Sequence, residues 1–532
     1  MKLIPGIKTT NWLIVFIYLF IATFLIVVHL RLYEYAFDDA FIHFRVARNL
    51  FETGYPYYNA NDLLKVSTSS GWIIFLTIFF GIARLINIEN HFPLSINIIN
   101  AFILFCDLYI YTRIVEILLK NRLSFSQIFL FQIILVALLL PSSIGLMETP
   151  LALLMAGLGI HLLLLSNPSG FALLGLAAYI RLELLILIML AGLLVLVQKQ
   201  HKLHEVIGYI LLGTIPLVAF DLIFFQTVVP HSIIAKSVVY SLPALDTLLR
   251  MLMQPLPVFL NSSNQVGIIA RSITILATLI ITSWVAFREK KNLNGFWSLL
   301  FYLLSLGIMS IYVYGHALIF NWYTPLYMVP LLLACFLYSI TAQHPRNIIL
   351  KIPLVALFFF STTFLFRTFY AGVYNPGAFI LFESGVRLKT YLEVGRILND
   401  EYPGASLLTS EIGGLGYSFR GEILDAAGLA SSDALPYYAG KNYLQEANID
   451  IGAIPPGYVK ATLPDIIVSY DVFAQALLSD AIINQYNIIV IPAYLPEDAI
   501  YSTSETIGDS KYLRVYIHKK LPITEGFRGL ED

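Results

Sequence analysis

The sequence has 532 residues, of which 58% are hydrophobic and 13% are charged, whereas an ordinary soluble domain carries about 25% charged residues. The mean hydropathy of +0.76 indicates too little polar surface to face water over the whole length, so we predict a polytopic membrane protein. The formal net charge of −1 argues against a nucleic-acid partner, which needs a basic face. The two cysteines, Cys106 and Cys335, lie in apolar runs, so neither a disulfide framework nor a zinc site is expected.

The first apolar run covers residues 12–30 and follows Lys2 and Lys8. About 20 residues suffice to span a bilayer. A signal peptide has a shorter apolar core that is followed by a small-residue cleavage site. We therefore predict an uncleaved first helix that starts in the cytoplasm.

Ten further apolar runs bring the predicted number of transmembrane helices to about eleven. They cover residues 72–87, 94–119, 127–140, 149–166, 171–197, 206–228, 265–287, 295–314, 323–342 and 349–370. Eleven spans place three basic clusters in the cytoplasm, as the positive-inside bias requires. These clusters are at 199–202, 288–291 and 344–351.

The stretch at residues 120–140 does not fit this arrangement. Lys120 and Arg122 fall on the outer side when eleven spans are counted, against the same bias. The 127–140 run, which Pro141 ends, is short for a full span. Re-entrant or half-membrane helices are therefore an alternative here.

The tail is a different kind of sequence. From about Glu383 charged residues return at the density of a soluble protein, and residues 385–400 have the pattern of an amphipathic helix. Strands mixed with helices predict a small α/β domain. The short β-like runs lie at 406–409, 465–468, 487–491 and 513–518.

We therefore predict two domains. A transmembrane domain covers residues 1–370, with its first outer loop at 31–71, and an extracytoplasmic α/β domain covers 371–532. The glycines at 413–416 lack the spacing of a dinucleotide-binding loop, so we predict a turn there.

The first outer loop opens with two adjacent aspartates, Asp38 and Asp39. Aromatic residues recur after them at helical spacing, at Phe37, Phe41 and Phe44, and predict an amphipathic helix on the membrane surface. One interpretation is that the aspartates cap this helix. The other is that one carboxylate is a general base, since partial burial beside a second carboxylate raises its pKa.

Several charged residues lie inside or beside apolar runs, where ionisable groups are costly, so each is a candidate site residue. For Arg181 and Glu183 the alternative is a local pair that stabilises a helix break. For Asp221 we prefer a polar contact between helices. The residues concerned are Glu148, Arg181, Glu183, Asp221 and Lys236.

These motifs resemble, in their order, those of the GT-C glycosyltransferase superfamily, in particular the branch of the bacterial terminal arabinofuranosyltransferases and the protein mannosyltransferase-like enzymes. The matching elements are Asp38 to Ile42 with Arg45, Asn49, Gly54 and Asn59; Ser67 to Trp72; Gly145 to Thr149; Arg181 to Glu183; Pro230 to Ser232 with Ala235 and Lys236; Asn321 to Tyr323 with Pro325 and Pro330; and Gly413 to Tyr417 with Leu424, Asp425, Gly428 and Leu429. Three positions depart from the family pattern, namely Lys65, Leu182 and His231. These departures concern the sugar and the acceptor more than the fold.

The resemblance implies a GT-C-like helical membrane fold and a defined reaction. Such enzymes move a sugar from a polyprenyl-phosphate donor to a glycan, lipid or protein acceptor on the outer side of the membrane, with inversion, and an outer-loop aspartate acts as general base. The implied catalytic residues are Asp38 and Asp39, with Asp38 preferred as the base. The implied donor-phosphate ligands are Lys236, Arg181, His231 and Arg45. The implied sugar or acceptor ligands are Glu148, Asn321, Trp322 and Tyr323.

The resemblance also implies a location in the bacterial plasma membrane, with the C-terminal domain outside. No cofactor is expected, and a single Asp pair is a poor cage for the divalent metal that some relatives by fold use. A transporter or lipid flippase is the alternative function, because it also explains intramembrane charges. Transporters typically carry inverted repeats with broken helices in matching halves, and the sequence has no clear repeat.

Overall fold

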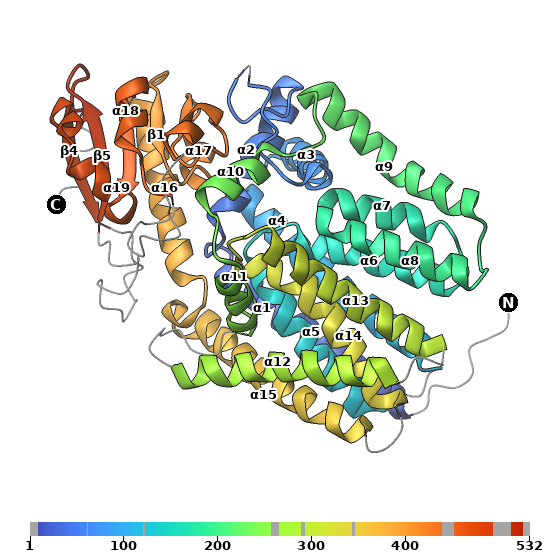
Figure 1. Cartoon of the computed structure of the whole chain (residues 1–532). Coiled ribbons are helices and arrows are strands. Elements are labelled where there is room, and N and C mark those ends of the chain that lie inside the picture. The colour runs from blue at the N-terminus through green and yellow to red at the C-terminus, as the bar shows by residue number, and fades with distance from the viewer. Residues whose placement is uncertain are drawn as a thin grey trace.

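The computed structural model describes residues 9–60, 62–120, 123–256, 265–288, 293–342, 346–438, 452–492 and 512–524. The helices of the first part are α1 (Thr9–Leu32), α2 (Asp38–Thr53), α3 (Ser70–Leu85), α4 (Phe92–Leu118), α5 (Phe125–Ile144), α6 (Thr149–Leu164), α7 (Gly170–Ile180), α8 (Leu185–Val197), α9 (Leu203–Phe225), α10 (His231–Val239), α11 (Ala244–Met253), α12 (Gln265–Arg288), α13 (Leu293–Tyr314), α14 (Thr324–Thr341) and α15 (Arg346–Val373). Figure 1 shows them as a bundle with a smaller α/β part at one corner.

Local sequence explains several helix ends. Ser124 and Gln127 form a capping box at the start of α5, in which each side chain bonds the other residue's backbone N–H. Gly54 ends α2 with a φ of 80°, a left-handed conformation that a residue without Cβ adopts readily.

Every predicted apolar run is helical in the structure. Within the described residues, eight helices are long and apolar enough to cross a membrane, or nine if the bent pair α10–α11 is one span. The runs at 72–87, 149–166 and 171–197 form the shorter helices α3, α6, α7 and α8. The prediction of a polytopic helical protein is confirmed, but two of the predicted spans are arranged differently.

The helix at 72–87 was predicted to be a span, and this is wrong, because α3 does not run between the two ends of the bundle. It lies along α2, and Arg84 near its end is 3.7 Å from Glu52 near the end of α2. The next helix, α4, also starts beside α2, where the rings of Phe92 and Phe44 are 5.2 Å apart. Both ends of α3 therefore lie at the end of the bundle that holds α2, called the α2 end below.

The run at 171–197 is two short helices instead of one span. Helix α7 ends at Ile180, Arg181 has an extended backbone (φ −142°, ψ 108°), and α8 follows a 3-10 turn, η2 (Leu182–Leu184). Charges at mid-membrane are costly, and the apolar run is interrupted where Arg181 and Glu183 occur.

The bent pair α10–α11 stays at the α2 end. The two helices meet at an angle of 104°. The backbone N–H of His231 donates to Lys65 O at 2.9 Å, and that of Leu242 donates to His316 O at 2.8 Å. These bonds hold the pair against the first loop and the α13–α14 loop, so it does not cross.

The predicted count of about eleven spans is therefore higher than the eight, or nine with the bent pair, that are long and apolar enough within the described residues. Helix α4 starts beside α2 and is 27 residues long, so Lys120, just after its end, lies at the end of the bundle opposite to α2. The end of α8, the start of α9 and the end of α12 lie at that same end (Figure 1), and Lys199, Lys202 and Arg288 are at or next to these helix ends. Arg122, Lys290, Lys291 and His344 lie outside the described residues.

The C-terminal part contains a mixed sheet flanked by helices. Its elements are α16 (Phe382–Glu401), β1 (Leu407–Thr409), α17 (Gly414–Ser418), β2 (Ile423–Asp425), α18 (Pro456–Thr462), β3 (Ile466–Tyr470), α19 (Asp471–Leu478), β4 (Tyr486–Pro492) and β5 (Tyr512–His518). The strand order is β2-β1-β3-β5-β4. Strand β1 is parallel to β2 and β3, whereas β5 is antiparallel to β3 and β4.

The α/β class, the amphipathic helix and the four predicted strands are confirmed. The three-residue strand β2 was not predicted, because a run of three residues is too short to show the alternation of apolar and polar side chains that indicates a strand. The predicted turn at 413–416 is wrong, since these glycines start the short helix α17. The predicted domain boundary at 370 falls in the last turn of α15 and stays a prediction.

The C-terminal part packs against the segment between α1 and α3, which contains α2. Helix α17 lies between α16 and α2 (Figure 1), and Tyr58 Oη donates to Ile412 O at 2.6 Å. Arg45 of α2 donates to the backbone carbonyls of Gly416, Phe419 and Gly421. Segments more than 350 residues apart in the sequence thus form one surface at the α2 end.

Candidate active site

Helix ends from distant parts of the chain meet at a narrow recess at the α2 end. The residues that line it are Asp39, Ile42, His43, Val66, Ser67, Thr68, Met147, Glu148, Arg181, Ser232, Lys236, Trp322, Tyr323 and Leu429. Six of the ten residues that the sequence nominated are therefore together here. They are Asp39, Glu148, Arg181, Lys236, Trp322 and Tyr323.

A larger cavity of about 430 Å³ adjoins the recess. Thr68, Arg181, Lys236 and Tyr323 line both. The remaining wall of the larger cavity is mostly apolar and comes from α10, the end of α13 and the α13–α14 loop. It includes Ile233, Ile311, Leu318 and Phe320.

Arg181 is buried at the break between α7 and α8 and holds two carboxylates. Its guanidinium nitrogens lie 2.6 Å from Glu148 Oε1 and 3.0 Å from Glu183 Oε1. Tyr312 Oη donates to Glu183 at 2.6 Å, and the Arg181 guanidinium lies 4.7 Å from the centre of the Tyr323 ring. The local Arg181–Glu183 pair is present, and Glu148 joins it.

Lys236 is the second cation of the recess. It projects from α10, and its Nζ lies 3.6 Å from Asp39 Oδ2 and 5.5 Å from the centre of the Phe320 ring. Lys236 and Asp39 are both partly exposed, at 26% and 30%. This ion pair is therefore looser than that of Arg181, and Lys236 can reorient towards an anion.

Asp38 is half-buried and binds the C-terminal part instead of capping its own helix. The residue before α2, Phe37, makes no side-chain cap, whereas Asp38 Oδ2 and Oδ1 accept the backbone N–H groups of Gly413 and Gly414 at 2.8 and 2.7 Å. A Cβ at Gly413 would lie 1.9 Å from Asp38 O, so glycine is required for this approach.

The environment of Asp38 suits a proton acceptor. Burial, followed by the nearby carboxylate of Glu411, raises the pKa of Asp38 to about 7, although the two backbone N–H bonds act in the opposite direction. A general base works best when its pKa lies near the operating pH. Asp39, and not Asp38, lines the recess, so the two aspartates have different surroundings.

Comparison with solved structures identifies the fold. ArnT from Cupriavidus metallidurans, in a crystal structure with bound undecaprenyl phosphate, aligns with 97% of this chain and 100% of its own, at a TM-score of 0.54 and 11% identity. The chain has a GT-C-like fold. The mycobacterial arabinofuranosyltransferase AftD aligns at 13% identity and a TM-score of 0.42, over 97% of this chain and 42% of its own.

Sequence comparison matches only the C-terminal part of the chain. A family model described as a domain of unknown function, DUF8728, matches residues 380–515, which are the C-terminal part from the start of α16 to β5. No curated protein matches the sequence. The GT-C-like fold therefore rests on the three-dimensional comparison.

Four residues nominated from the sequence either do not line the recess or have side chains that are already engaged by other parts of the protein. His231 Nε2 is 3.1 Å from Gly428 O, Arg45 is bonded to backbone carbonyls as described, and Asn321 does not line the recess. Trp322 lies between the rings of Phe37 and Phe320 and is 5% exposed, so it has no free face for a sugar.

His43 lines the recess and was not nominated from the sequence. Its Nδ1 is 2.9 Å from Ser67 Oγ, and its Nε2 is 3.8 Å from Glu148 Oε2. Burial lowers its pKa, so His43 is neutral at pH 7. Its position four residues after Asp39 places both on one face of α2, and this spacing was the available signal.

Asp221 has a structural role, as we preferred from the sequence. It bonds Lys65 and Ser70 and so joins α9 to the first loop. Lys65, a departure from the family pattern, is thus matched by a buried carboxylate. In the residues that the structure describes, no group of three or more His, Cys, Asp or Glu side chains is placed to hold a metal ion.

Proposed function

We propose that the protein is a membrane glycosyltransferase. It moves a sugar from a polyprenyl-phosphate donor to an acceptor on the outer side of the membrane, with inversion at the anomeric carbon. The observation that carries the proposal is a recess lined by Asp39, Arg181 and Lys236 that adjoins an apolar cavity, with the carboxylate of Asp38 on the residue before Asp39.

The donor fits the adjoining cavity. Its apolar wall suits an isoprenoid chain, and Arg181 and Lys236 at the shared boundary suit a phosphate. Two carboxylates already neutralise Arg181, so Lys236 is the cation that responds to the charge of the leaving phosphate. ArnT, which shares the fold, has bound undecaprenyl phosphate in its crystal structure, and this supports a lipid phosphate as the donor's leaving group.

The acceptor hydroxyl loses its proton to Asp38 as its oxygen attacks the anomeric carbon. The bond from that carbon to the phosphate oxygen breaks, and polyprenyl phosphate leaves with the bonding electrons. Asp38 is oriented by two backbone N–H groups, while Asp39 holds Lys236. Glu148, His43 and Tyr323 are placed to contact the sugar.

The direct test uses the purified protein in nanodiscs with a panel of undecaprenyl-phosphate-linked sugars. We expect release of undecaprenyl phosphate that depends on an added acceptor extract. Movement of an intact lipid-linked sugar across vesicle membranes, with no release of the phosphate, would instead favour the flippase alternative.

Orientation is a second testable part of the proposal. We propose that the α2 end and the C-terminal part face outwards, because Lys120, Lys199, Lys202 and Arg288 lie at the opposite end and positive charge favours the cytoplasmic side.

Cysteine labelling in intact cells checks this orientation. Ser432 and Gln200 are exposed at the two ends. An impermeant maleimide is expected to label Ser432→Cys directly and Gln200→Cys after permeabilisation. The unsubstituted chain, with Cys106 and Cys335 inside helices, is the background control. The reversed pattern would place the recess in the cytoplasm and contradict the proposal.

A further inference from the structure

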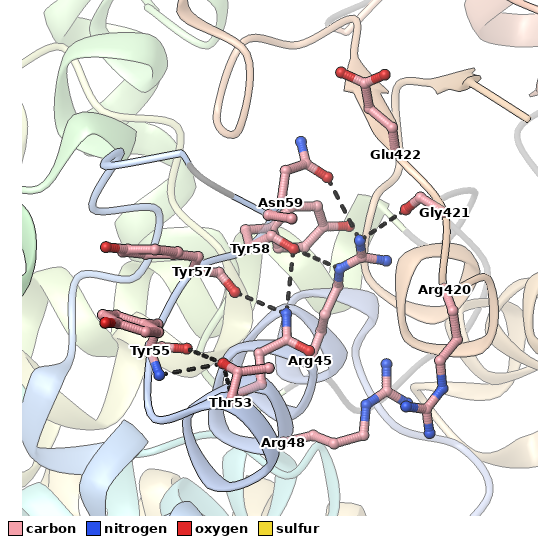
Figure 2. Close-up of a pocket in the computed structure, with 12 residues that line it drawn as sticks. Arg45, Arg48, Thr53, Tyr55, Tyr57, Tyr58, Asn59, Arg420, Gly421 and Glu422 are labelled. Atoms are coloured by element: carbon pink, nitrogen blue, oxygen red, sulfur yellow. Dashed lines mark hydrogen bonds between the residues drawn. The ribbon is translucent and has the colours of Figure 1, made fainter. Parts of the chain in front are cut away.

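A second cavity, of about 780 Å³, lies between the C-terminal half of α2, the loop that follows it, and the residues before β2 (Figure 2). It shares no lining residue with the recess or with the apolar cavity beside it. Its wall comes from both the first outer loop and the C-terminal part.

Arginines dominate the charge of this cavity. Arg45, Arg48 and Arg420 line it, against one acidic residue, Glu422. Arg420 pairs with Glu52 at 2.8 Å. Arg45 and Arg48 are 4% and 6% exposed, and their hydrogen bonds go to backbone carbonyls and to an amide, with no carboxylate partner in the described part of the chain.

Arg48 lines the cavity and is incompletely hydrogen-bonded. Its Nη1 donates to Tyr417 O at 2.9 Å, whereas its buried Nε has no hydrogen-bond partner. Burial, followed by the nearby Arg420 and Arg45, lowers the pKa of Arg48 to about 10. An anion in the cavity would relieve the repulsion between these cations.

The opposite wall is aromatic and amidic. Tyr55 and Tyr57 stack at 5.3 Å with their rings inclined by 20°, and Tyr55 is 52% exposed. Asn49 and Asn59 also line the cavity, and Asn49 Nδ2 donates to Tyr57 O at 2.8 Å. An exposed aromatic face packs against the C–H face of a sugar ring.

We propose that this cavity binds an anionic glycan, with its carboxylate or phosphate group at Arg48 and Arg420 and a sugar ring on Tyr55. The ligand's role as acceptor rests on the proposed function, whereas its binding does not. Asp38 and Arg45 are seven residues apart on α2, about 10 Å along the axis, and both bind the α17 segment. A glycan of a few rings covers this distance.

Direct binding to the full-length protein in nanodiscs tests the proposal. The probes are trigalacturonate, mannose 6-phosphate and neutral maltotriose. We expect at least one anionic probe to bind about tenfold more tightly than maltotriose, and Arg420→Gln to remove about tenfold of that affinity, the worth of one charge-assisted hydrogen bond. The tighter of the two anionic probes assigns a carboxylate or a phosphate glycan.

The controls separate this site from the catalytic one and from misfolding. Tyr55→Ser, at an exposed position, is expected to weaken the anionic probe, whereas Arg396→Gln, at an exposed arginine that pairs with Glu393 outside the cavity, is not. Asp38→Asn is expected to keep binding, so a failed transferase proposal leaves this result intact. Equal binding of charged and neutral probes, no binding, or no effect of Arg420→Gln would overturn the proposal.

Discussion

We expect Asp38→Asn to lower the rate of sugar transfer by about 10²–10⁴-fold, the contribution typical of a general base. An amide cannot accept the proton of the acceptor hydroxyl at neutral pH, whereas a carboxylate with a pKa of about 7 can. The measurement is release of polyprenyl phosphate at saturating donor and acceptor. Full activity in this variant would remove Asp38 from the base role.

The variant needs a structural control, because an amide at position 38 can accept from one of Gly413 and Gly414 but presents its NH₂ group to the other. The melting temperature and donor binding of Asp38→Asn therefore accompany the rate. Asp39→Asn is the matched substitution, and we expect it to weaken donor binding through Lys236 more than it lowers the rate. A larger loss of rate in Asp39→Asn would transfer the base role to Asp39.

The pH dependence gives an independent readout of the same group. The active form of Asp38 is deprotonated, and its pKa is raised to about 7. Transfer in the unsubstituted protein is therefore expected to fall about tenfold per pH unit below about 7 and to level off above it. Residual activity of Asp38→Asn is expected to lack this limb. The same limb in the variant would assign the titration to another group.

The second large effect is expected for Lys236→Met, with a loss of about 10²–10³-fold in turnover, comparable to the removal of one preorganised donor at a developing oxyanion. The leaving phosphate gains charge as its bond to the sugar breaks, and Lys236 is the less neutralised of the two cations at the recess. Because this stabilisation is greatest in the transition state, kcat is expected to fall more than donor affinity.

Two substitutions sharpen the test of Lys236. Lys236→Arg keeps the charge and is expected to retain part of the activity. Lys460→Met removes an exposed lysine that pairs with Asp480 in the C-terminal part, and we expect it to leave turnover unchanged. Turnover of Lys236→Met within twofold of the unsubstituted protein would show that Lys236 is not a ligand of the leaving phosphate.

The local sequence pattern was sufficient to predict the helices and four of the five strands that the structure describes in the sheet. Long apolar runs must satisfy their backbone groups internally in a membrane, so each becomes a helix. It was not sufficient to decide which helices cross. The 72–87 run has the composition of a span, but it lies beside α2. The 171–197 run is divided at Arg181 and Glu183 into two short helices.

Candidate site residues could be predicted from the sequence where a charge lies beside an apolar run, because burying a charge there is energetically costly. Charges such as Glu148, Arg181 and Lys236 are expensive beside apolar runs, and the structure brings all three to one recess. Arg45 and Trp322 stood in equally plausible motifs, but their groups are used by packing and by backbone carbonyls. No local pattern distinguishes a residue that faces a cavity from one that faces another chain segment.

The sequence by itself determined a helical membrane protein with a C-terminal α/β part, an acidic pair after the first apolar helix, and charged residues beside apolar runs as candidates for a site. These follow from composition, period and the cost of burying charge, which are local properties. The tertiary structure decided which residues meet. Asp38 binds Gly413 and Gly414 across more than 370 residues, and Arg45 faces a second cavity, because long-range packing fixes the neighbours of a side chain and no pattern along the chain specifies them.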